Sequence, residues 1–156
     1  MIATTHILAG AAITAKIKNP ILVILLALLS HFILDIIPHR DPRFKRRLSH
    51  ILLVSLDPIL GATYLLFLLI FFKIAVNWPL LILVIMIVTL PDFLSLAYFL
   101  FRFRALKQFY KFHQKLHWFE QETENLDNRP PPRYPLWFLF TQTIFWVIFS
   151  LIFIYC

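Results

Sequence analysis

Long apolar segments constrain the fold of this chain more than any other feature. A membrane-spanning helix needs about 20 consecutive apolar residues, and four segments approach that length: 21–37, 51–72, 79–101 and 136–156. Segment 2–17 is shorter, and it could span the membrane, re-enter it or lie at its surface. Hydrophobic residues make up 60% of the chain, well above the usual share in a soluble domain. We therefore expect an all-α, polytopic membrane helix bundle that forms one domain, 1–156. Four transmembrane helices are predicted, and segment 2–17 is the candidate for a fifth at the N-terminus.

Basic residues are concentrated in two connections between the apolar segments. Twelve of the 15 lysines and arginines lie in the loops 39–50 and 102–134. Lysine and arginine are enriched in cytoplasmic loops of membrane proteins, so both loops are predicted to be cytoplasmic. This topology and contact with anionic lipid headgroups already account for the net charge of +7, which makes nucleic-acid binding the less favoured interpretation.

A polar stretch separates the last two apolar segments. Within 105–123, apolar side chains recur at helical spacing among lysines: Leu106, Phe109, Phe112, Leu116 and Phe119. This pattern predicts an amphipathic helix on the cytoplasmic membrane surface. A proline-rich spacer follows, since consecutive prolines exclude a helix, and 105–133 is accordingly predicted to lie outside the bilayer.

Four ionisable residues interrupt the apolar segments: His31, Asp35, Asp57 and Asp92. A charge at membrane depth costs about 2.5 to 3.5 kcal/mol, so such residues are candidates for function. With both basic loops cytoplasmic, all four lie in the cytoplasmic half of the bilayer, Asp92 about 14 Å from the inner end of its segment. The opposite halves of these segments contain no charge. We therefore expect one site near the cytoplasmic surface.

The spacing of histidines and aspartates favours a metal centre. His31 and Asp35 are four residues apart and share a helix face, as do His113 and His117. His39 lies about 12 Å from His31 on a straight helix. Either Pro38 bends the chain and returns His39 to the site, or Asp35 lies between two metal ions. Imidazole and carboxylate ligands suit zinc, so we expect one or two divalent ions.

Two of the aspartates adjoin helix-breaking prolines. Pro58 follows Asp57, and Pro91 precedes Asp92. Proline leaves the carbonyl four residues earlier without its helical partner, and such backbone is tolerated at membrane depth only where protein or water satisfies it. Asp57 and Asp92 are thus predicted to line a wet pocket as catalytic residues, each serving as general base, further ligand or ligand partner.

The segments THILAG, SHFILDIIPHRDP and LPDF resemble the membrane-bound metal-dependent hydrolases, also described as LexA-binding, inner-membrane-associated hydrolases. The helical His-x3-Asp pair is also similar to that of zinc-dependent phospholipase C. The resemblance covers about residues 1–120, and it implies metal ligation by the positions His6, His31, Asp35, His39, His113 and His117. The chain departs from the family in having Arg47-Leu48-Ser49-His50 where Gly-His-Arg-Gly-x-Thr-His is common.

These patterns predict a zinc-dependent hydrolase of the inner membrane that acts on an ester or phosphoester. Its expected substrate is a lipid or other phosphorylated amphiphile at the cytoplasmic leaflet, because the candidate site lies beside basic loops. Two other classes stay open, namely a transporter of metal ions or protons and a membrane anchor without catalytic activity.

Overall fold

The computed structural model describes residues 3–37, 48–117 and 137–155. Within these ranges every regular element is helical, which confirms the all-α class. The elements are α1 (Ala3–Lys16), α2 (Pro20–Ile36), α3 (Leu48–Phe71), α4 (Trp78–Phe101), the 3-10 helix η1 (Arg104–Leu106), α5 (Lys107–Leu116) and α7 (Trp137–Ile154). Five of these helices coincide, to within a few residues, with the five apolar segments.

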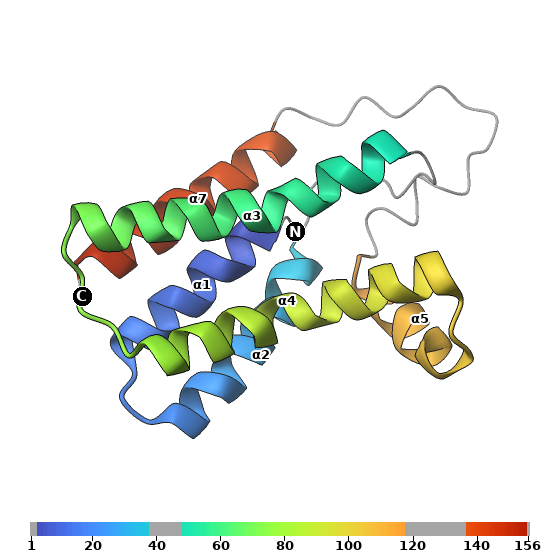
Figure 1. Ribbon diagram of the computed structural model, residues 1–156, viewed down its shortest axis with the longest axis horizontal. Coiled ribbons are helices and arrows are strands. Elements are labelled where there is room, and N and C mark those ends of the chain that lie inside the picture. The colour runs from blue at the N-terminus through green and yellow to red at the C-terminus, as the bar shows by residue number, and fades with distance from the viewer. Residues whose placement is uncertain (1–2, 38–47, 118–136, 156) are drawn as a thin grey trace.

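The long helices run back and forth along one axis of the bundle (Figure 1). The connections from α1 to α2 and from α3 to α4 lie at one end, on the left of the view. The short helix α5 lies at the opposite end, where it folds back against α4 and also contacts α2. The bundle therefore has two distinct ends, and α5 covers part of one of them.

The N-terminal helix α1 is the centre of the bundle. It contacts α2, α3, α4 and α7, and its residues from Thr4 to Ala12 are all buried. The run Ala9-Gly10-Ala11-Ala12 permits this, because small residues let helix backbones approach closely. A Cβ atom on Gly10 would lie 2.8 Å from Cγ1 of Val84 on α4. The first apolar segment is thus an internal core helix, surrounded by the other four.

Asparagine and proline begin two of the long helices. The side chain of Asn19 accepts hydrogen bonds from the backbone N–H groups of Ile21 and Leu22 at the start of α2. Asn77 accepts the N–H of Leu80 at the start of α4 in the same way. In both cases the next turn contains a proline, whose missing N–H costs nothing at a helix start. These caps fix where the chain turns at the end of the bundle opposite α5.

The predicted number of transmembrane helices is not supported by helix length and hydropathy. Within the described ranges, Trp78–Phe101 is the helix that is long and apolar enough to cross a membrane, with 24 residues and a hydropathy of 2.5. The apolar helical stretches Pro20–Ile36, Ser55–Phe71 and Phe140–Ile154 are shorter. The limits of the predicted apolar segments nevertheless agree with those of the helices to within a few residues.

The predicted surface helix is present in part. The segment 105–123 was expected to be one amphipathic helix, whereas η1 and α5 together cover Arg104–Leu116. Residues 118–123 and the proline-rich spacer lie outside the described residues, as does most of the basic loop 39–50.

We predict that Gly61→Ala destabilises the protein. The added Cβ would lie 2.8 Å from both Cα and Oγ1 of Thr4, so α1 and α3 would have to separate. Overpacking of this kind costs about 1 to 3 kcal/mol, which exceeds the gain of up to about 1 kcal/mol from replacing a helical glycine. Thermal unfolding in detergent should show a lower midpoint than in the wild type. The control is Ala62→Leu, at the exposed neighbouring position, which should leave the midpoint nearly unchanged. A higher midpoint for Gly61→Ala would contradict the close approach of α1 and α3 at this position.

Candidate metal centre

The carboxylate of Asp35 is the centre of a buried cluster of imidazoles. Its Oδ2 atom lies 3.1 Å from Nε2 of His31 and 3.0 Å from Nε2 of His113. Its Oδ1 atom lies 3.2 Å from Nε2 of His6. All of these side chains are buried. Helices α1, α2 and α5 therefore converge on one carboxylate.

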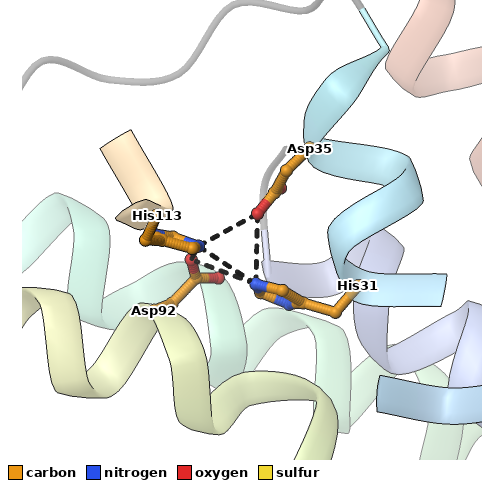
Figure 2. Close-up of side chains that lie close together, drawn as sticks. All are labelled: His31, Asp35, Asp92 and His113. Carbon is orange, nitrogen blue, oxygen red and sulfur yellow. Dashed lines mark hydrogen bonds and ion pairs between the residues drawn. The ribbon is translucent and has the colours of Figure 1, made fainter. Parts of the chain in front are cut away.

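Asp92 of α4 completes one side of the cluster. Its Oδ1 atom is 3.6 Å from Nε2 of His113 and 3.9 Å from Nε2 of His31. Figure 2 shows the four side chains of His31, Asp35, Asp92 and His113 pointing toward one another from α2, α4 and α5. Their candidate ligand atoms all lie within 4.8 Å of one another. The Asp92 side chain is 32% exposed, whereas that of Asp35 is fully buried, so Asp92 is the most exposed of the four side chains.

Helical periodicity explains how these residues meet. On α2 the buried positions Val23, Ala27, His31 and Asp35 are each four residues apart, so the two ionisable groups continue an apolar stripe. On α4, positions 88, 92 and 95 lie on one face for the same reason. The apolar parts of these stripes pack together as Val23, Ala27, Val84 and Val88, which sets the ionisable residues opposite each other at the α5 end of the bundle.

The backbone of α4 determines that Nδ1 of His31 carries a hydrogen. Its Nδ1 atom lies 2.7 Å from the carbonyl oxygen of Val88. A carbonyl can only accept, so Nδ1 carries the hydrogen and donates it. In the neutral imidazole, Nε2 then has a lone pair, and this lone pair faces Asp35.

When both imidazoles are neutral, the cluster contains more acceptors than donors. Nε2 of His31 lies 3.2 Å from Nε2 of His113, and at most one of the two can carry a hydrogen between them. Both atoms also face Oδ2 of Asp35, which is an acceptor when ionised. Lone pairs at such distances repel each other in a buried site. The arrangement is stable only when a proton or a cation lies among these atoms.

The spacing of the four side chains fits a tetrahedral metal ion. Zinc bonds of about 2.0 to 2.1 Å imply neighbouring ligand atoms about 3.3 Å apart. The distances between Nε2 of His31, Nε2 of His113 and Oδ2 of Asp35 are 3.0, 3.1 and 3.2 Å, and Oδ1 of Asp92 is 3.6 and 3.9 Å from the two imidazoles. The four residues therefore fit a divalent ion in both donor chemistry and spacing, although the distances do not distinguish zinc from other metals.

Ser95 is a site residue that the sequence analysis did not identify. Its hydroxyl lies 2.9 Å from Nδ1 of His113, and the residue is buried. When the hydroxyl accepts the Nδ1 hydrogen, Nε2 of His113 is left as a ligand, as in His31. Ser95 lies three residues after Asp92, on the same helix face, and this spacing was the signal that could have revealed it.

His6 and His117 lie beside the four-residue cluster. His117 directs Nε2 to within 3.6 Å of Oδ2 of Asp35, and His6 contacts the other carboxylate oxygen. His113 of α5 and His117, which follows the end of that helix, are both buried, so the predicted pair faces the site and not solvent. His39, the last member of the predicted His-x3-Asp-x3-His block, lies outside the described residues.

Asp57 has a different environment from the other predicted site residues. Its side-chain oxygens lie 2.7 Å from Oγ1 and 3.3 Å from the backbone N of Thr4, and its carbonyl oxygen accepts a further hydrogen bond from Oγ1. A carboxylate at a helix N-terminus satisfies donors that the helix itself leaves unpaired. Asp57 thus stabilises the start of α1, two residues before His6, and it is not among the four clustered ligands. A catalytic role for Asp57 remains a prediction.

Comparisons with protein-family models, with curated proteins and with solved structures gave no match. The site must therefore be interpreted from its own chemistry.

We predict that Asp35→Ala destabilises the metal-free protein far more than Asp92→Ala. Removing one partner from a buried ion pair costs about 3 to 5 kcal/mol, whereas the partly exposed Asp92 lies farther from both imidazoles. Denaturant unfolding of the two variants in excess chelator provides the measurement. Equal losses would show that Asp35 is not the centre of the cluster.

Proposed function

We propose that this protein is a membrane-embedded, metal-dependent hydrolase whose ion is held by His31, Asp35, Asp92 and His113. The observation that carries the proposal is that two imidazoles and two carboxylates place their ligand atoms within 4.8 Å of one another, a spacing that suits a tetrahedral ion. Two imidazoles and two carboxylates match the ligand preferences of zinc, which is the ion we propose. We propose one or two ions, as the sequence predicts, because His6 and His117 also contact Asp35.

The residues around the ion support hydrolysis of an ester or phosphoester. A bound divalent ion supplies Lewis-acid activation of water and of the substrate oxygen. When Asp92 is not a ligand, His31, Asp35 and His113 would hold the ion and leave its fourth position open to water. Asp92, the most exposed carboxylate of the cluster, would then accept a proton from that water. Val88 and Ser95 orient the two imidazoles through Nδ1, so the reactive geometry is fixed before substrate binds.

Exposed apolar side chains support the membrane location. Large hydrophobic residues cover the outer faces of several helices, including Ile21, Leu25 and Leu29 on α2, Phe67 and Ile70 on α3, Met86 and Phe93 on α4, and Ile144 and Leu151 on α7. Soluble proteins seldom expose contiguous apolar surfaces of this extent. We propose that these faces contact lipid, with α5 and the basic loops at the cytoplasmic surface, and that more helices enter the bilayer than their lengths alone indicate.

The position of the cluster favours an amphiphilic substrate. It lies at the α5 end of the bundle, where exposed apolar side chains such as Phe93 and Ile33 meet basic residues of 102–115. A phosphorylated headgroup with an apolar tail matches both surfaces. The resemblance of the His31–Asp35–His39 segment to membrane-bound metal-dependent hydrolases agrees with this reaction class.

Transport is the second candidate function, and the packing of the described core favours hydrolysis over it. A conduction path needs polar groups across the bundle. Beyond the cluster, the described core is mostly apolar, with Leu8, Leu65, Leu68, Leu81 and Phe153 among its members, and the buried polar residues there are Thr4, Thr5 and Ser150.

Metal analysis of the purified full-length protein tests the proposal. We expect about one zinc ion or more per chain in the wild type, and its loss in His31→Ala and His113→Ala because each removes a ligand. Ser150→Ala, a buried hydroxyl on α7, is the control and should retain the ion. A folded wild-type protein that binds no divalent metal would favour the anchor. Release of a phosphorylated headgroup, without ion flux across liposomes, would separate the hydrolase from the transporter.

We also predict that Ser95→Ala weakens zinc binding by about 10- to 100-fold, the usual cost of losing a hydrogen bond that orients a histidine ligand. Ser30→Ala serves as the matched control, because the Ser30 hydroxyl bonds the carbonyl of Ala27 in its own helix and no imidazole. Competition with a chromophoric chelator measures both affinities. An unchanged affinity in Ser95→Ala would show that His113 is not oriented through Nδ1.

A further inference from the structure

One exposed surface at the α5 end of the bundle combines positive charge with aromatic side chains. We call it the basic face and define it by five exposed cations: Arg102, Arg104, Lys107, Lys111 and Lys115. Residues 101–117 contain no aspartate or glutamate, so the segment does not neutralise these charges itself. Phe101, Phe103 and Phe112 lie among the cations, with 66%, 56% and 52% of their surfaces exposed.

The opposite side of the same short segment belongs to the metal centre. His113 enters the cluster from α5, and the ring of Tyr110 packs against that of Tyr98 on α4 at 4.7 Å between centroids. One ten-residue helix therefore carries a metal ligand on its inner side and the basic face on its outer side.

The helix that carries His113 has little intrinsic stability. Isolated helices shorter than about 12 to 15 residues are marginal in water, and α5 has ten residues. The chain reaches it through Arg102, a non-glycine residue in the left-handed conformation with φ of 56°. Contacts on the outer side of α5 consequently affect how firmly His113 is held in the cluster.

We propose that the basic face docks on an anionic bilayer surface and that this contact holds His113 in the metal centre. The inference rests on the proposed function, because it assigns a regulator to the same site. Lysine and arginine near an anionic membrane surface are attracted to its headgroups, and exposed aromatic rings enter the interfacial layer. The docked surface continues into the apolar side of α4 through Phe101 and Phe93, which are 66% and 65% exposed. Nucleic-acid bases also stack on aromatic rings, but the continuation of this surface into the exposed apolar side of α4 favours a bilayer.

The test compares metal binding by the full-length protein in nanodiscs of phosphatidylcholine alone and of phosphatidylcholine mixed with phosphatidylglycerol. The probe is Zn²⁺ alone. We expect tighter binding with the anionic lipid by about fivefold or more, the usual lower range of coupling between two sites. Lys107→Gln/Lys111→Gln/Lys115→Gln should bind Zn²⁺ as the wild type does in phosphatidylcholine and should show a smaller increase than the wild type with the anionic lipid.

Three lysines at the other end of the bundle provide a matched control with the same change in charge. Lys16, Lys18 and Lys73 are exposed there, and Lys16→Gln/Lys18→Gln/Lys73→Gln should keep the increase. Accumulation of Zn²⁺ at an anionic surface raises the apparent affinity of every variant alike, so the comparison isolates the basic face. A nitroxide on Lys111→Cys, with Cys156→Ser, should report contact with the headgroup layer.

The outcomes separate the two proposals. An increase in zinc affinity that is as large in Lys107→Gln/Lys111→Gln/Lys115→Gln as in the wild type would overturn the lipid coupling and leave the metal centre intact. An absence of zinc binding in both lipids would overturn the proposed function together with its regulation. If single-stranded DNA added to phosphatidylcholine nanodiscs raised the affinity as much as the anionic lipid does, the assignment of the basic face to a membrane would be wrong.

Discussion

A buried carboxylate surrounded by imidazoles organises this molecule. Asp35 lies within 3.2 Å of histidines from α1, α2 and α5. An isolated charge in such a position is very costly, and it is tolerated only with partners that share or neutralise it. The helices that supply those partners must therefore come together at one end of the bundle. Their convergence couples the fold and the site, because neither α1 nor α5 can move away without leaving the carboxylate poorly compensated.

Close packing along α1 makes this convergence possible. The helix is buried on all sides, and its small residues allow α3 and α4 to approach its backbone at Gly61 and Gly10 respectively. Asp57 then bonds the first turn of α1 through Thr4 and sets the position from which His6 reaches Asp35. An aspartate that the sequence suggested as catalytic thus has a clear structural effect on the site, exerted through the helix it stabilises.

Helix α4 orients two imidazoles of the site. Val88 offers a backbone carbonyl to His31, and Ser95 offers a hydroxyl to His113. Both contacts engage Nδ1 and direct Nε2 into the cluster. The carbonyl leaves Nε2 of His31 as the ligand atom, and the Ser95 hydroxyl does the same for His113 when it accepts the Nδ1 hydrogen. The same helix supplies Asp92, the most exposed side chain of the four. One face of α4 therefore orients the two imidazoles and contributes the second carboxylate.

The sequence by itself determined the helical class, the limits of the five long helices and the gathering of histidine and aspartate at one end. These follow from local rules, since hydropathy locates apolar helices and the four-residue spacing of His31 and Asp35 puts both on one face. Only the tertiary structure decided that α1 is the central helix, that Asp35 and not Asp57 is the centre of the cluster, and that Ser95 and the Val88 carbonyl orient its histidines. Those outcomes depend on which helix faces pack together and on the position of each residue along the bundle axis. Residues far apart in the chain carry no local signal of which helix faces meet.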